Sequence, residues 1–211
     1  MDFVVVGGGI HGASVAYFLS LQEGCNRARS ITLVERSKIA SAASGKAGGF
    51  LARNWGDGPT VQLHKKSFDL HSELANTLNI RSYRKGLKVV SVDGNLERSA
   101  INAKNCSWLD RKCSVSPLDD SGAQVTPEEL TQRLVEASGC TVVIDIALGV
   151  EMDESSNFRG VRTAANGVIS GDRLIIAAGP WTGVLVEEWF PHLICPMEGI
   201  KSTSMLYEAI S

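Results

Sequence analysis

The sequence of 211 residues lacks several features that would indicate particular classes of protein. Its charges nearly cancel, with 21 Lys and Arg against 23 Asp and Glu, so the composition offers no strongly basic surface for nucleic acid. No apolar run approaches the roughly 20 residues that a helix needs to cross a bilayer. Aromatic residues are sparse at 6%, but hydrophobic residues reach 44%, which is ample for a folded core. We therefore expect a soluble globular protein with no transmembrane segment and no nucleic-acid partner.

Metal-binding and disulfide patterns are also missing. None of the five cysteines belongs to a Cys-X-X-Cys pair, which argues against a structural zinc site and against a disulfide framework. His64 and His71 are seven positions apart on a mostly polar predicted helix, whereas zinc helices place two histidines four apart. Met1 and Asp2 lead directly into an apolar strand, without the charged region of a signal peptide. We expect a cytoplasmic location and no metal site.

The most informative feature is the motif Gly7-Gly8-Gly9-Ile10-His11-Gly12, a G-x-G-x-x-G that follows an apolar strand and opens a predicted helix. In this context the first glycine permits a tight turn, the second lets the backbone approach a pyrophosphate, and the third lets the helix pack against the strand. The amide groups and the dipole at the helix N-terminus favour phosphate charge. The motif therefore predicts a dinucleotide site at the start of the chain.

An acidic residue completes this fingerprint. Glu35 ends a second predicted strand, Ser30–Glu35, and lies 23 residues after Gly12, where its carboxylate can accept hydrogen bonds from a ribose. NAD and FAD both use this fingerprint. The segment Ser41–Phe50 favours FAD, because its small side chains and backbone donors suit a chain that passes close to a pyrophosphate and a flat ring. An NAD-dependent dehydrogenase is the weaker alternative.

The remaining pattern alternates between helical and strand periods. Residues 40–58 are rich in Gly, Ala and Ser, show neither period, and are expected to form a loop. Helices are expected at 59–79, 99–109 and 127–138, the last with Thr126 as its cap. Strands are expected at 88–92, 141–146, 148–153, 158–164, 167–170 and 174–178, with a hairpin turn at Asn166-Gly167.

These motifs resemble the D-amino-acid oxidase type of FAD-dependent oxidoreductase, the group that contains glycine and sarcosine oxidases. The resemblance covers nearly the whole chain and rests on the glycine motif, Glu35-Arg36, and the segments 43–49, 125–130 and 174–182. It implies an α/β fold in which a Rossmann-like FAD-binding domain is interrupted by segments of an α+β substrate domain. The FAD-binding domain would comprise residues 1–82 and 117–186, and the partial substrate domain residues 83–116 and 187–211.

The resemblance also implies which residues bind FAD. Those near the pyrophosphate would be Gly7, Gly9, Ile10, His11 and Gly12. Glu35 would bind the adenosine ribose, with Arg36 beside it. A second segment would follow the pyrophosphate, the ribityl chain and the ring edge: Ala42, Ala43, Ser44, Ala47, Gly48 and Gly49. Ala178, Gly179 and Trp181 would lie near the adenine side or the ribityl chain, and a strand around Ala147 would meet adenine through its backbone.

The function that this resemblance implies is oxidation of the carbon–nitrogen bond of an amine or amino acid, with hydride transfer to the flavin. Members of the family are longer, and the part after the position of Ser211 carries the groups that bind the substrate carboxylate. The sequence therefore assigns no catalytic residue and no oligomeric state. The alternative is a truncated or degenerate relative that has lost catalysis and acts as an interaction protein.

Overall fold

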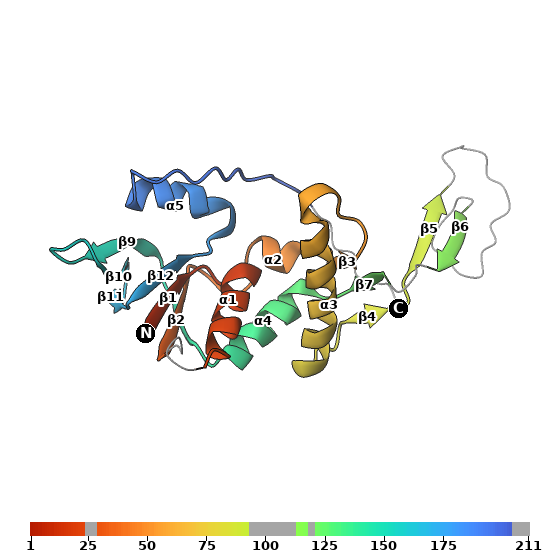
Figure 1. Ribbon diagram of the computed structural model, residues 1–211, viewed down its shortest axis with the longest axis horizontal. Coiled ribbons are helices and arrows are strands. Elements are labelled where there is room, and N and C mark those ends of the chain that lie inside the picture. Colours follow the sequence, from red (N-terminus) through yellow and green to blue (C-terminus); the bar gives the residue numbers. More distant parts are fainter. Residues whose placement is uncertain (24–28, 93–112, 118–120, 204–211) are drawn as a thin grey trace. The chain divides into compact units, whose positions relative to one another are not determined.

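The computed structural model describes residues 1–23, 29–92, 113–117 and 121–203 (Figure 1). Backbone contacts divide the chain into two compact units. The first unit combines Met1–Gly48 with Pro127–Ser211, and the second is the intervening segment Gly49–Thr126. These units are defined by packing alone, so the assignment of residues 1–82 and 117–186 to FAD and of 83–116 and 187–211 to substrate stays a prediction.

A parallel sheet of four strands forms the centre of the first unit, in the order β12-β1-β2-β8. Its strands are β1 (Asp2–Val6), β2 (Ser30–Glu35), β8 (Thr141–Ile144) and β12 (Arg173–Ile176). Phe3 is in register with Ile31 on one side and with Arg173 on the other. Because both faces of a parallel sheet are covered, its central strands are continuous apolar runs, and Val4, Val5 and Leu33 are fully buried.

Two helices pack together in this unit: α1 (Ile10–Ser20) and α4 (Pro127–Ser138). Figure 1 shows α1 in red and α4 in green, side by side. Small residues on α1 permit the close approach, since Ala13 and Ala16 are completely buried. Leu130 and Leu134 of α4 are buried at helical spacing. The strand–helix–strand unit and the helix at 127–138, both predicted from the sequence, are confirmed.

An antiparallel sheet of three strands, in the order β11-β10-β9, belongs to the same unit. Its strands are β9 (Ala147–Met152), β10 (Phe158–Thr163) and β11 (Gly167–Ser170). The predicted hairpin at Asn166-Gly167 joins the last two, with Gly167 at a φ of 69°. Val161 of β10 packs with Val4, Val6 and Val34 in one buried cluster, together with residues of the short helix α5 (Thr182–Trp189). This cluster joins the two sheets of the first unit.

The second unit contains the helix α3 (Val61–Thr77), which a short 3-10 turn, η2 (Gly58–Thr60), precedes. Its three-stranded sheet has the order β3-β7-β4, formed by β3 (Phe50–Ala52), β7 (Gly122–Gln124) and β4 (Arg84–Lys85). A separate antiparallel pair is made by β5 (Lys88–Val92) and β6 (Cys113–Pro117). Arg53, which follows β3, and Asp69 of helix α3 form a bidentate ion pair.

The structure corrects several sequence predictions. Residues 40–58 are not wholly irregular, because they contain the helix α2 (Ala43–Lys46) and strand β3. Elements this short show too few residues for a period to be detected. Strands β4, β6 and β7, the 3-10 turn η3 (Gly179–Trp181) and helix α5 were also not predicted. The helix predicted at 99–109 lies outside the described residues. In the described ranges, no helix combines the length and apolar character needed to cross a membrane.

Candidate cofactor-binding site

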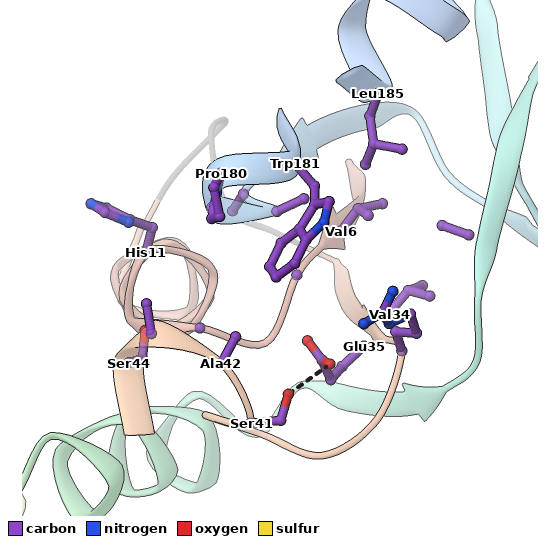
Figure 2. Close-up of a pocket in the computed structure, with 18 of the residues that line it drawn as sticks. Val6, His11, Val34, Glu35, Ser41, Ala42, Ser44, Pro180, Trp181 and Leu185 are labelled. Atoms are coloured by element: carbon purple, nitrogen blue, oxygen red, sulfur yellow. Dashed lines mark hydrogen bonds between the residues drawn. The ribbon is translucent and has the colours of Figure 1, made fainter. Parts of the chain in front are cut away.

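A pocket of about 260 Å³ lies at the carboxyl ends of the parallel strands (Figure 2). Each of the four strands contributes residues at or just after its end, such as Val6 at the end of β1 and Ala177 after β12. In open α/β sheets, ligands bind in the crevice outside the carboxyl ends of the strands. All lining residues belong to the first unit.

Most residues predicted to bind a cofactor meet in this pocket. Those that line it are Gly7, Gly9, Ile10, His11, Glu35, Arg36, Ala42, Ala43, Ser44, Ala178, Gly179 and Trp181. The predicted Gly12, Ala47, Gly48 and Gly49 are not among its lining residues. Gly12 lies in the first turn of α1, Ala47 and Gly48 follow α2, and Gly49 begins the second unit.

Two glycines of the motif are required by close backbone packing. A Cβ atom on Gly12 would overlap the Gly7 carbonyl oxygen and would lie 3.4 Å from the Val5 side chain. Gly7 has a φ of 114°, which favours glycine, and a Cβ atom there would overlap the Ala177 carbonyl. The sequence-based roles of these glycines in the turn and in helix–strand packing agree with this geometry.

Backbone amides at the start of α1 provide donors toward the pocket. The Gly8 N–H donates to Glu35 Oε2 at 2.8 Å, and the Ile10 N–H donates to Ser44 Oγ at 2.9 Å. In the described part of the chain, the N–H groups of Gly9 and His11 make no hydrogen bond to protein atoms. They are therefore available to an anion, which the positive end of the helix dipole also favours.

The Glu35 carboxylate is held in a fixed orientation. Besides the Gly8 amide, it accepts a hydrogen bond from the Ser37 N–H at 3.0 Å and a longer one from the Ser41 hydroxyl at 3.4 Å. Figure 2 shows Glu35 and Ser41 across the pocket from Trp181. A carboxylate has about four acceptor positions, so Glu35 retains capacity for a ligand hydroxyl.

Arg36 and Trp181 form a contact at the pocket. The Arg36 guanidinium carbon lies 5.7 Å from the centre of the Trp181 ring, within the range of a cation–π interaction. Trp181 is 48% exposed, so one part of its ring remains open to a ligand. The sequence predicted both residues for the site, but it did not predict that they touch each other.

Sequence reasoning missed part of the lining. Asp145 and Ile146 follow β8, Leu185 lies on α5, and all three line the pocket. Asp145 was the easiest to find, because a polar residue directly after the apolar run 141–144 lies at the carboxyl end of a parallel strand. Ala147, expected near adenine, does line the pocket beside them.

The fold and this pocket define a mixed α/β domain of the FAD-dependent oxidase type. The family model described as FAD dependent oxidoreductase, DAO, matches residues 2–211, and the chain belongs to this family. The family predicted from the sequence is therefore confirmed. The pocket also fits the cofactor that defines the family, because open amides, a glycine turn and the acid predicted to bind ribose converge on it.

Similar proteins include oxidases and an oxidoreductase of yeast. A Schizosaccharomyces pombe protein named as an oxidoreductase is 31% identical over 214 residues, which cover 88% of this chain and 56% of that protein. The 4-methylaminobutanoate oxidase (formaldehyde-forming) of Paenarthrobacter nicotinovorans is 29% identical over 206 residues, 85% of this chain and 24% of that enzyme. Glycine oxidase from Bacillus cereus has a similar fold, with a TM-score of 0.66 and 20% identity over 89% of this chain and 57% of the oxidase. The chain thus spans little more than half the length of the first of these relatives.

Proposed function

We propose that the pocket binds FAD and that the chain carries the cofactor-binding part of an enzyme that oxidises the carbon–nitrogen bond of an amine or amino acid. The observation that carries this proposal is the placement of Glu35 beside the available amides of Gly9 and His11. An anionic pyrophosphate and a ribose hydroxyl need these two kinds of group next to each other.

Each part of the dinucleotide has matching groups in the pocket. The amides at the start of α1 would bind the pyrophosphate, together with the small residues Ala42 and Ala43. Glu35 would accept hydrogen bonds from the adenosine ribose, as the sequence predicts. The base would then extend past Glu35, where Arg36 and Ala147 line the pocket. Ala47, Gly48 and Gly49 keep their predicted place along the ribityl chain and the ring edge as a proposal.

When bound, the flavin would supply the acceptor for a hydride from the substrate. The contribution of the described residues is to bind and orient the cofactor, because no group of this pocket stands out as a general base. The substrate class is supported by the names of two similar proteins, a methylaminobutanoate oxidase and a glycine oxidase. A cytoplasmic location is supported by Cys140 and Cys195, which are free thiols.

Titration of the purified protein with FAD, followed by gel filtration and an absorption spectrum, tests the cofactor proposal. We expect flavin absorbance to remain with the protein. Glu35→Gln should weaken FAD binding by roughly ten- to a hundredfold, because a hydrogen bond to a charged acceptor contributes roughly 1.5–3 kcal/mol. Glu128→Gln is the matched control, since Glu128 pairs with Lys38 on the surface and does not line the pocket. A protein that stays colourless, or equal FAD affinity in the two variants, would contradict the proposal.

The substrate class needs a separate test on the FAD-loaded protein. Anaerobic addition of glycine, N-methylglycine and 4-methylaminobutanoate should bleach the flavin absorbance in proportion to hydride transfer. Lactate is the control, because it carries a hydroxyl group in place of the amine. Bleaching by lactate alone, or by none of these compounds, would argue against amine oxidation by this chain.

A further inference from the structure

Asp145 is a buried carboxylate that the cofactor fingerprint does not include. Only 7% of the residue is exposed, and it lies directly after β8 at the carboxyl end of the parallel sheet. The described residues contain no Lys, Arg or His that forms an ion pair with it. A buried charge without an ionic partner is costly unless hydrogen bonds compensate for it, so its neighbours need an explanation.

Backbone amides provide that compensation. Asp145 Oδ1 accepts a hydrogen bond from the Ile146 N–H at 2.7 Å. Oδ2 accepts from the Ala165 N–H at 2.9 Å, from the Asn166 N–H at 2.9 Å, and from Asn166 Nδ2 at 2.7 Å. Burial raises the pKa of Asp145, but the hydrogen bonds from Asn166 and Ala165 outweigh burial and hold the pKa well below its usual range. The side chain is therefore a carboxylate at physiological pH.

These hydrogen bonds join three parts of the first unit at one point. They tie the turn between β10 and β11 to the residues that precede β9. The Ala164 N–H donates to the Ile146 carbonyl at 3.0 Å, which strengthens the same junction. On its other side, the Asp145 N–H donates to the Glu35 carbonyl at 2.8 Å. Asp145 thus joins Ile146 to the turn between β10 and β11 through its side chain, and to Glu35 through its backbone N–H.

In the proposed FAD site, this junction fixes the pocket wall that would lie next to the nucleoside. Glycine-motif amides mark the pyrophosphate end and Glu35 marks the ribose, so the base extends to the wall of Ile146 and Ala147. We propose that Asp145 is a positioning residue that sets this wall, and with it the affinity of the pocket for the adenosine part of the cofactor. The proposal rests on the proposed FAD site and adds to it a residue at the pocket that would act by fixing the backbone of the wall.

Replacement of the Asp145 carboxylate by an amide of the same size is enough to test the proposal. Because backbone N–H groups point at both carboxylate oxygens, Asn at position 145 would place its NH₂ group against at least one donor. Two buried donors that face each other cannot both be satisfied, so the junction has to open. Asp145→Asn keeps the size of the side chain, removes its charge and breaks this compatibility, and the Asp153→Asn control removes a carboxylate charge as well.

Asp153→Asn is a matched control, because Asp145 and Asp153 flank the same strand, β9. The Asp153 carboxylate also accepts backbone hydrogen bonds, from Ser155 at 2.9 Å and Asn157 at 2.8 Å, and it pairs with Arg159. It lies in the turn between β9 and β10 and does not line the pocket. Both substitutions therefore disturb a turn that is held by hydrogen bonds to a carboxylate. Only Asp145→Asn also disturbs the wall of the pocket.

The experiment measures dissociation constants of FAD, ADP and FMN by calorimetry for the wild type and for both variants, with circular dichroism as a check on folding. ADP carries the adenosine and the pyrophosphate without the flavin, and FMN carries the flavin without the adenosine. We expect Asp145→Asn to weaken FAD and ADP by a similar factor of about ten, to leave FMN unchanged, and to speed hydrogen exchange at Ile146 and Ala165. Asp153→Asn should leave all three affinities within twofold of wild type.

Folded Asp145→Asn protein with wild-type affinity for ADP would overturn the proposal, and so would an equal loss in the Asp153 variant. Where Asp145→Asn does not fold, Asn166→Ala takes its place, because it removes one donor and keeps the carboxylate; unchanged ADP affinity in that variant would likewise overturn the proposal. Failure of the proposed function is seen separately, in wild-type protein that binds no FAD, and the inference then falls with it.

Discussion

Ser44 caps helix α1 from 34 positions along the chain, because its hydroxyl oxygen accepts a hydrogen bond of 2.9 Å from the Ile10 amide. The short helix α2, which carries Ser44, thereby lies against the glycine motif, and both segments line the same pocket. This hydrogen bond holds the segment that follows Glu35 against the start of α1.

Replacement of Ser44 by Ala removes this cap. We expect Ser44→Ala to lower the free energy of unfolding by about 1 kcal/mol, the typical cost of losing a side-chain cap at a helix N-terminus. Urea titration followed by circular dichroism measures the change. Ser41→Ala is the control, because Ser41 makes only a 3.4 Å hydrogen bond to Glu35 and should cost less. A larger loss for Ser41→Ala than for Ser44→Ala would contradict the capping role.

Gly12→Ala should lower the stability of the protein more than Gly139→Ala does. Gly12→Ala places a Cβ atom into the Gly7 carbonyl, so the turn or the helix must shift, at a cost of roughly 1–3 kcal/mol or more. Gly139→Ala is the comparison, because no atom lies within 4 Å of its Cβ position and only its φ of 62° opposes the change. Thermal unfolding should give the lower midpoint for Gly12→Ala. The reverse order would show that helix–strand packing is looser than the structure indicates.

Binding of FAD should quench tryptophan fluorescence mainly through Trp181. Its ring lines the pocket beside Arg36, and quenching by a flavin nucleotide falls steeply with distance. We expect Trp181→Phe to lose most of the FAD-induced quenching, whereas Trp55→Phe should retain it, because Trp55 does not line the pocket. Fluorescence titration with FAD measures both. Equal quenching in the two variants would argue that the cofactor binds away from Trp181.

The turn after β9 should make stability depend on pH in acid. Hydrogen bonds from Asn157, together with Arg159, lower the pKa of Asp153 from the usual 3.8 to about 2. Between these values the unfolded chain binds the proton and the folded chain does not, so the stability contributed by Asp153 is present above about pH 4 and is lost as the pH falls toward 2. The difference in unfolding free energy between wild type and Asp153→Asn should therefore shrink across this range. A difference that stays constant from pH 5 to pH 2 would contradict the assignment.

The sequence predicted the parts of the site that are close together in the chain. The glycine motif, the strand that ends at Glu35 and the small residues before Lys46 each carry a local signal, because turn chemistry and strand ends depend on neighbouring residues. The order of the strands in the sheet carries no such signal. Asp145 and Leu185 reach the pocket only because β8 lies beside β2 and β12 beside β1.

Short elements were the other source of error. The helix α2 has a single turn and β3 has three residues, so neither repeats its period even once. The contact between Arg36 and Trp181 could not be predicted. Arg36 follows β2, Trp181 lies in the turn η3, and the two are far apart in the chain. Residues Ala47, Gly48 and Gly49 carry a family signal, but their place outside the pocket lining depends on where α2 ends.

The position of β1 in the sheet affects how the protein is made on the ribosome. β1 leaves the ribosome well before β12, which is one of its two neighbours and whose Arg173 pairs with Phe3. At the usual rate of roughly 5–20 residues per second, that strand emerges roughly 10–35 seconds later. During this interval one edge of an apolar strand has no native partner, and such an edge promotes aggregation. We therefore expect the yield of the protein in cells to depend on chaperones that shield strand edges.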